Sequence, residues 1–286
     1  MKAGLPYRVQ IALFLLASVF VSNALARDHL VMGIHPYKSP AKLIQSYTPL
    51  AEYLSRKIGI PVRILISKDY QTHINAIGKD QLDIAYMGPA SYVSLVDHFG
   101  KKPILARQEF NGKSTFQGKI IIRKDSSLTS LSQLKGKSFA FGDPSSTMSH
   151  LVPRYMLIKN GVNANQLDHY KFLGSHDNVA LAVLSGDYEA GAVKEGVFYK
   201  YEKRGLKVLD TTPALSEHLF VASKTLDDAT VKKLREAFFA LSKDPAGPKI
   251  MNSIKQGITA MTAVEDKDYN NLREILNTLK KTGVIK

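Results

Sequence analysis

The segment Phe139-Ala-Phe-Gly-Asp-Pro-Ser-Ser-Thr-Met-Ser-His150 joins an apolar run to a turn and a cluster of hydroxyl side chains. The run from Ser138 to Phe141 predicts a buried strand, and Gly-Asp-Pro predicts a turn that ends it. Ser145, Ser146 and Thr147 then precede a helical segment. A strand that ends at hydroxyl groups and at the free N–H groups of a helix start is suited to hold an anion. Helix capping alone is the alternative interpretation, because Ser and Thr are common caps.

The first 26 residues have the pattern of a secretory signal peptide. Lys2 and Arg8 form a positive region, Val9–Val21 is an apolar core, and Ala24-Leu25-Ala26 is a small-residue cleavage site. The apolar core is short for a membrane span. We therefore expect cleavage after Ala26 and a mature protein in the periplasm.

Composition limits the classes of function. The chain has 286 residues, 44% of them hydrophobic, which is typical of one or two globular domains. It has no cysteine, which excludes disulfides, thiol catalysis and a lipid-modified N-terminus. The formal net charge is +14, and loss of Lys2 and Arg8 with the signal peptide lowers it to +12. The basic residues are dispersed, so we expect no nucleic acid partner and no binding to a membrane surface, and the positive charge is compatible with a small anionic ligand.

Short apolar runs alternate with amphipathic segments, which predicts an α/β fold with parallel strands. Two successive sets of strands and a helical tail predict two lobes with a ligand cleft between them. The expected strands are 30–34, 62–66, 82–86 and 103–107 in the first set, then 118–123, 138–141, 170–173, 190–193, 206–209 and 218–222. The longer expected helices are 40–58, 89–99, 227–241 and 266–280, and a helix that follows the hydroxyl cluster is expected to end near Asn160.

Three expected strand-to-helix junctions carry similar polar groups: Gly88-Pro-Ala-Ser-Tyr92, Asp143-Pro-Ser-Ser-Thr147 and Gly174-Ser-His-Asp177. Tyr37 and Tyr70 also lie at expected strand ends, as does Tyr86. In parallel α/β sheets ligands bind at the carboxyl ends of the strands. Hydroxyl, imidazole and backbone N–H donors at such an edge suit an oxyanion with several acceptor oxygens.

These junctions also resemble a known family. The segments Leu82-Asp-Ile-Ala-Tyr-Met-Gly-Pro89, Gly142-Asp-Pro-Ser-Ser-Thr-Met-Ser-His-Leu-Val-Pro153 and Gly174-Ser-His-Asp177, followed by a run that ends at Gly191, are similar in order and content to the phosphate, phosphite and phosphonate substrate-binding proteins of ABC importers. The resemblance covers nearly the whole expected mature chain.

The resemblance implies a monomeric, two-lobed periplasmic binding protein of type II topology that closes about a hinge on its ligand and docks on a membrane permease. It implies two crossings between lobes, near 114–118 and 212–217. The expected division is residues 27–115 in lobe 1, 116–215 in lobe 2, and 216–286 returning to lobe 1.

The resemblance also implies roles for the matching residues. Ser146 and Thr147 would donate hydrogen bonds to the oxyanion, with Ser145 beside them. His176 would donate from the next loop, and Tyr70 would reach the ligand from the other lobe. The alternatives are ordinary packing for Tyr70 and helix capping for His176.

The sequence departs from the family pattern at two donor positions. Met148 stands where a hydroxyl is common, with Ser149 as its expected substitute, and Phe116 stands at a position that is often Tyr. Some members of the family bind the aminoalkyl group of their ligand with acidic side chains. In this sequence, Glu195 and Glu217 lie near the corresponding positions. Solvated surface acids are the alternative, and for Glu the more usual one.

The sequence gives weaker support to other classes of function. Ser175-His176-Asp177 has the residue types of a hydrolase, but adjacent residues do not form a catalytic relay. The eight His lack paired metal-ligand spacing, and no Gly-rich nucleotide loop is present, so we expect no metal and no cofactor. A ligand-sensing subunit of a receptor kinase and a binder of another oxyanion or a sulfonate both remain open alternatives.

Overall fold

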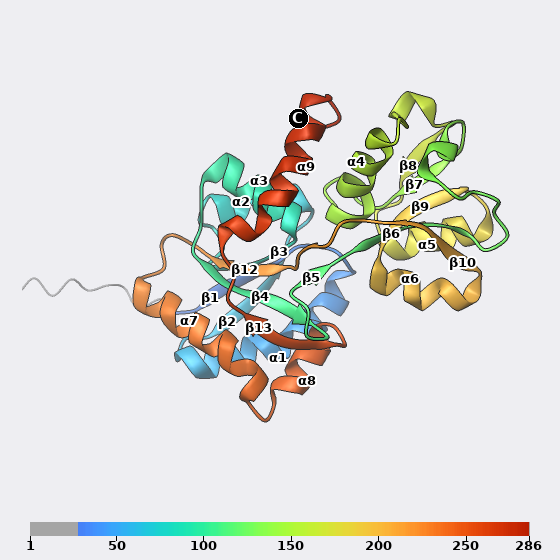
Figure 1. Cartoon of the computed structure of the whole chain (residues 1–286). Helices are drawn as coiled ribbons and strands as arrows, with labels where there is room; N and C mark the ends of the chain where they lie inside the picture. The colour runs from blue at the N-terminus through green and yellow to red at the C-terminus, as the bar shows by residue number, and fades with distance from the viewer. Residues whose placement is uncertain (1–27, 286) are drawn as a thin grey trace, which may run out of the picture.

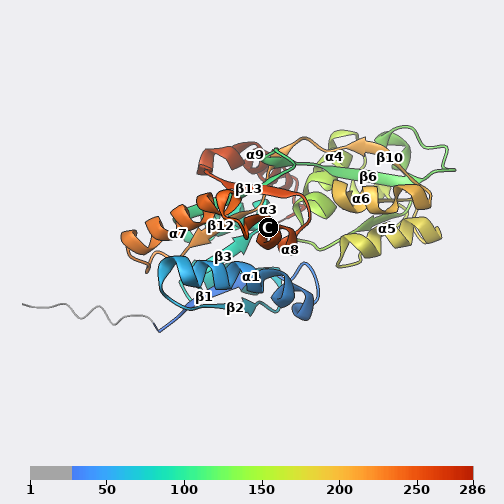
Figure 2. The same cartoon turned by 90° about the horizontal axis from the view of Figure 1, so that it is seen from below.

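Two β-sheets organise the computed structural model, which describes residues 28–285 (Figure 1). The predicted signal peptide lies outside the described residues. The six-stranded sheet has the order β13-β4-β12-β3-β1-β2, and the five-stranded sheet has the order β10-β6-β9-β7-β8. We call the part built on the first sheet lobe 1 and the part built on the second sheet lobe 2. The two lobes lie side by side in both views (Figures 1 and 2).

The strands of lobe 1 follow an in-and-out alternation that sorts their side chains between two cores. Leu30, Met32 and Ile34 of β1 face one core, whereas Val31 packs against the other. The strands of this sheet are β1 (Leu30–Ile34), β2 (Val62–Ile66), β3 (Ile84–Met87), β4 (Ile104–Phe110), β12 (Leu219–Ala222) and β13 (Ile258–Thr262). Those of the second sheet are β6 (Gly118–Arg123), β7 (Phe139–Phe141), β8 (Tyr170–Phe172), β9 (Ala190–Lys194) and β10 (Leu206–Thr211).

Helices cover both faces of each sheet. In lobe 1 one core is closed by α1 (Pro40–Ile58), α7 (Asp228–Ala240) and α8 (Gly247–Ile254). The other core is closed by α2 (Tyr70–Gly78), α3 (Pro89–Phe99) and α9 (Asn270–Lys281). In lobe 2, α4 (Val152–Lys159) covers one face, and α5 (His176–Ser185) and α6 (Glu195–Tyr201) cover the other. Within residues 28–285, no helix has the length and apolar character needed to cross a membrane.

The expected parallel direction is right for most of the predicted strands, including β7, which pairs in parallel with β8 and β9. It is wrong for β6 and β12, which run opposite to the other predicted strands of their sheets. β1 pairs in parallel with β2 and β3, as the alternation of strands and helices predicts. β4 runs in the same direction as these strands but pairs with none of them, because β12 returns from lobe 2 and enters the sheet between β3 and β4, antiparallel to both. β13 is also antiparallel to β4. β6 is likewise antiparallel to β9 and β10. The sequence prediction also missed β13.

Two short strands cross between the lobes. β5 (Thr115–Phe116) and β11 (Leu215–Ser216) form an antiparallel pair outside both sheets. Figure 1 shows the chain passing from β4 through β5 to β6, and returning from β10 to β12. The division at 115 and 215 that the resemblance implies stays a prediction of the domain boundaries.

The segment after β7 begins with one π-helical turn, η2 (Thr147–Leu151), and continues as α4. Pro153 lies in the first turn of α4, where the absence of an N–H costs no helical hydrogen bond. The hydroxyl cluster therefore does begin a helix, but through a wide turn and not through a regular α-helical one.

Gly191 in β9 allows α5 to lie close to the second sheet. A Cβ at this position would lie 2.6 Å from Val179 Cγ1 and 3.1 Å from the Ala140 carbonyl oxygen. We expect Gly191→Ala to lower the free energy of unfolding by about 1–3 kcal/mol, because overpacking forces the helix outward. Urea denaturation measures this change. Gly196→Ala is the matched control, since a Cβ there meets nothing within 4 Å, and equal stability of the two variants would contradict the packing argument.

Candidate functional site

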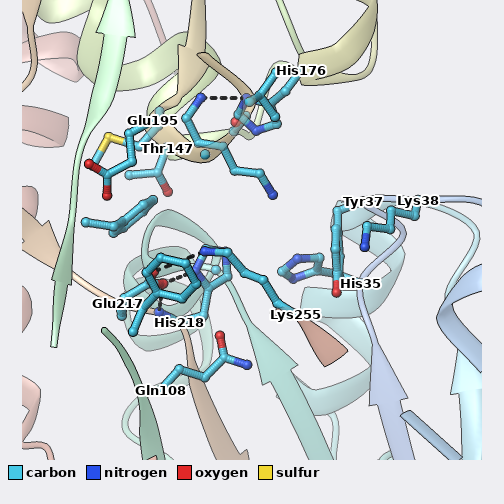
Figure 3. A pocket seen from close by; sticks show the side chains of 18 of the residues that line it. His35, Tyr37, Lys38, Gln108, Thr147, His176, Glu195, Glu217, His218 and Lys255 are labelled. Carbon is cyan, nitrogen blue, oxygen red and sulfur yellow. Dashed lines mark hydrogen bonds and ion pairs between the residues drawn. The ribbon is translucent and has the colours of Figure 1, made fainter. Parts of the chain in front are cut away.

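A cavity of about 390 Å³ lies between the lobes, and side chains from both line it (Figure 3). Its walls come from the carboxyl ends of strands in both sheets, which is where α/β folds bind ligands. Ten of the eleven site residues predicted from sequence line it: Tyr37, Tyr70, Tyr86, Phe116, Ser145, Ser146, Thr147, His176, Glu195 and Glu217.

Helices from both lobes begin at this cavity. Tyr70 is the first residue of α2 and His176 the first of α5, while Gly88 is the N-cap of α3. Each helix start presents backbone N–H groups and the positive end of a helix dipole. The cavity is therefore suited to bind negative charge.

The hydroxyls of Ser146 and Thr147 are oriented by bonds that they accept. Ser146 Oγ accepts from the Ser149 N–H at 3.2 Å, and Thr147 Oγ1 accepts from the Ala90 N–H of α3 at 3.1 Å. Because backbone donors occupy their oxygens, the hydroxyl protons are left to donate elsewhere. Capping and ligand binding are thus compatible for Ser146, and the Ala90–Thr147 bond joins the two lobes.

His176 is fixed as a neutral donor. Its Nδ1 accepts a hydrogen bond from the Lys194 N–H at 3.1 Å (Figure 3). Burial, and then the positive charge of Lys194, lower the pKa of His176 to about 3. The single proton of the neutral ring is consequently on Nε2. The capping alternative does not describe this residue, because Ser175 is the N-cap of α5.

The three predicted tyrosines have different roles. The Tyr37 and Tyr47 hydroxyls share a hydrogen bond of 3.1 Å, and the Tyr86 hydroxyl donates to Gln108 Oε1 at 3.1 Å. The Tyr70 hydroxyl bonds to no group in the described part of the chain, and the Tyr70 ring stacks on His35 at 4.8 Å between centroids. Burial raises the pKa of Tyr70, so this hydroxyl stays protonated and is a free donor.

The prediction of Ser149 as a substitute donor is wrong. Its side chain is fully buried beneath the cavity wall, and its hydroxyl donates to the Ala192 carbonyl oxygen at 2.5 Å. Met148 and Phe116 line the cavity as expected, and both present apolar surface there. The site therefore has fewer hydroxyl donors than the family pattern implies.

Glu195 and Glu217 are not surface acids, contrary to the more usual alternative. Both line the cavity, and Glu217 is 2% exposed. Glu217 Oε2 accepts from the N–H of His218 at 2.9 Å and from its Nδ1 at 2.7 Å. Lys255 Nζ lies 3.8 Å from Glu217 Oε1. Despite burial, which opposes ionisation, His218 and Lys255 lower the pKa of Glu217 to about 2.

Sequence reasoning missed several polar residues in the cavity. His35 and Gln108 are buried, and neither His35 Nδ1 nor Gln108 Nε2 has a hydrogen-bond partner among residues 28–285. Lys38, Lys194 and Lys255 also line the cavity. The position of His35 directly after β1 was the available signal, since this strand ends at the same edge as β2 and β3. In the described part of the chain, no group of three or more His, Asp or Glu has the arrangement of a metal site.

The ion pairs of Glu217 should make stability depend on pH. A carboxylate whose pKa is lowered on folding stabilises the protein above its unfolded pKa near 4.5, and this contribution is lost as the pH falls toward about 2. We expect Glu217→Gln to cost about 3 kcal/mol of unfolding free energy at pH 7. The difference from wild type should shrink as the pH falls below about 4.5. Urea denaturation across this range measures it.

The control for that experiment is Glu236→Gln, which removes an exposed carboxylate 4.0 Å from Lys232 on α7. We expect it to change stability little at any pH. A deficit of Glu217→Gln that stays constant down to pH 3 would contradict the assignment of an ionised, paired Glu217.

Comparisons with known proteins agree on one class. A binding protein component of an ABC phosphonate transporter from Pseudomonas aeruginosa superposes with a TM-score of 0.77 at 25% identity, covering 89% of this chain and 87% of that one. PhnD1 from Prochlorococcus marinus, solved with methylphosphonate, superposes with a TM-score of 0.79 at 23% identity, covering 89% and 99%. Fold and cavity together define a two-lobed solute-binding protein.

The sequence comparisons name the family. The phosphonates-binding periplasmic protein of Escherichia coli K12 is 25% identical over 281 residues, which are 93% of this chain and 82% of the relative. The probable phosphite-binding protein of the Prochlorococcus marinus transporter is 25% identical over 292 residues, covering 93% and 95%. The family model for periplasmic substrate-binding proteins of phosphonate ABC transporters matches residues 32–269. The chain belongs to this family.

Proposed function

We propose that this protein binds a small phosphorus oxyanion, such as a phosphonate, phosphite or phosphate, in the periplasm and delivers it to an ABC importer. One observation carries the proposal. Four hydrogen-bond donors face one cavity, Tyr70 from lobe 1 and Ser146, Thr147 and His176 from lobe 2. A tetrahedral oxyanion has acceptors for all of them. A relative in the same family is a phosphonate-binding protein.

Hinge closure about β5 and β11 is part of the proposal. Within residues 28–285, only these two short strands and their flanking residues carry the chain between the two sheets. A ligand held by donors from both lobes favours the arrangement in which both reach it. The closed form would then be the one that docks on the permease, as a monomer.

A non-enzymatic role fits the geometry around His176 better than hydrolysis does. Ser175 Oγ accepts from the Asn178 N–H as a helix cap, and His176 Nδ1 accepts from the Lys194 N–H. Asp177 accepts from Lys200 Nζ and from the Tyr201 hydroxyl. The imidazole therefore lacks the orienting carboxylate that a general base requires.

Two alternatives keep the fold. In the first, the closed protein docks on a receptor kinase as a sensing subunit; genes for a permease and an ATPase beside this one would favour import. In the second, the ligand is a sulfonate or another oxyanion, which the experiment below separates.

Tyr70→Phe is the sharpest test of the oxyanion site, because it removes one unpartnered hydroxyl and keeps the ring that stacks on His35. Wild type should show a raised melting temperature with a phosphorus oxyanion, since a ligand at a hundred times its Kd stabilises by about 2.7 kcal/mol. The panel is phosphate, phosphite, methylphosphonate, 2-aminoethylphosphonate, sulfate and an alkanesulfonate. We expect Tyr70→Phe to weaken binding of the best ligand about tenfold or more, as for a lost bond to a charged group.

Tyr199→Phe is the matched control, because the Tyr199 side chain is 58% exposed and lies outside the cavity. Its affinity should equal that of wild type. A melting-temperature increase with sulfate or the sulfonate alone would refute the phosphorus oxyanion, and an unchanged affinity in Tyr70→Phe would refute the assigned donor set.

A further inference from the structure

A cluster of ammonium groups lies in the cavity beside the oxyanion donors. Lys38 follows β1 in lobe 1, Lys194 ends β9 in lobe 2, and Lys255 follows α8. Lys38 Nζ and Lys194 Nζ lie 5.5 Å and 5.6 Å from the centroid of the Tyr37 ring. The two lobes thus bring two positive charges to the same aromatic side chain.

Two of these lysines form no direct ion pair with the carboxylates around the cavity. Lys255 is near Glu217, and Lys200 is bound to Asp177. Across residues 28–285, neither Lys38 nor Lys194 has a carboxylate within ion-pair distance. Burial, and then the charges of Lys255 and Lys38, lower the pKa of Lys194 to about 8, although the more distant Glu217 and Asp177 oppose this. An ammonium group in this situation is stabilised by any anion that reaches it.

The donors assigned to the phosphorus oxyanion are all neutral. Tyr70, Ser146 and Thr147 donate hydroxyl protons, and His176 donates from an uncharged ring. Lys38 and Lys194 are additional to this set. Glu195, a third acid that lines the cavity, is drawn on the same side of it as Thr147 in Figure 3, and Tyr37 and Lys38 are drawn on the other side.

The size of the cavity also exceeds what a bare oxyanion fills. Its volume of about 390 Å³ corresponds to about a dozen waters of about 30 Å³ each. Methylphosphonate has five non-hydrogen atoms and would leave space for a longer ligand. His35 Nδ1 and Gln108 Nε2, both buried and without partners among the described residues, provide further polar groups in that space.

We infer that the natural ligand carries a second anionic group, such as a carboxylate or a second phosphoryl group, and that Lys38 and Lys194 bind this group beside Tyr37. The inference rests on the proposed function, because the first oxyanion is assigned to the donors of that site. It specifies the ligand class as a bifunctional organophosphorus dianion, and Lys194 as a residue that determines specificity.

The test compares ligands of similar length that differ in their terminal group: propylphosphonate, 2-carboxyethylphosphonate and 2-aminoethylphosphonate, with methylphosphonate as reference. Isothermal titration calorimetry at pH 7 and low salt measures each Kd. Wild type should bind the carboxylated ligand at least tenfold more tightly than propylphosphonate. In Lys194→Met and in Lys38→Met this ratio should fall toward one, while the Kd of methylphosphonate changes less.

Lys249→Met is the control for net charge, because Lys249 is an exposed residue of α8 outside the cavity, and its ratio should equal that of wild type. If wild type binds 2-carboxyethylphosphonate no more tightly than propylphosphonate, the inference is overturned and the proposed function stands. The same follows from a preference for the aminated ligand that Glu195→Gln abolishes, or from an equal loss of methylphosphonate binding in Lys194→Met. Failure of every phosphorus oxyanion to bind overturns both the inference and the proposed function.

Discussion

The hydrogen bond from the Ala90 N–H to Thr147 Oγ1 links the start of α3 in lobe 1 to the hydroxyl cluster of lobe 2. With the lobes in this arrangement, Tyr70 and His176 face the same cavity. The arrangement also encloses polar atoms, such as His35 Nδ1, that have no partner in the described part of the chain. Buried polar groups without partners oppose closure, and a ligand that bonds to them removes this penalty. In the proposed closure on a ligand, closing and binding would be coupled through these atoms.

Local patterns allowed much of the fold and site to be predicted. The amphipathic pattern of α1 and its stop at Gly59, which has a φ of 77°, are properties of adjacent residues. The same holds for the hydroxyls before α4 and for His176 at the start of α5, because a strand, a turn and a helix cap are each encoded within a few positions. Ten of the eleven predicted residues line the cavity for this reason.

What the sequence could not predict depends on partners far apart in the chain. Ser149 belongs to the hydroxyl cluster by its position in the sequence. Its hydroxyl nevertheless turns away from the cavity to bond to the Ala192 carbonyl, 43 residues away. Glu217 resembles a surface acid until His218 and Lys255 are placed around it. The antiparallel insertion of β12 between β3 and β4 was not predicted, because β12 comes from beyond lobe 2 in the chain. In each case the deciding contact is between elements and not within one.

The position of β12 between β3 and β4 has a consequence for how the molecule assembles. Every strand of the second sheet lies within residues 118–211, so this sheet is complete as a continuous stretch of chain. The first sheet lacks an interior strand until residues 219–222 are present, and β3 and β4 have unpaired edges until then. Pairing over such a sequence separation forms slowly, because a long loop must close first. The second sheet is therefore able to pair all of its strands before residues 219–222 are present, whereas the first sheet is not.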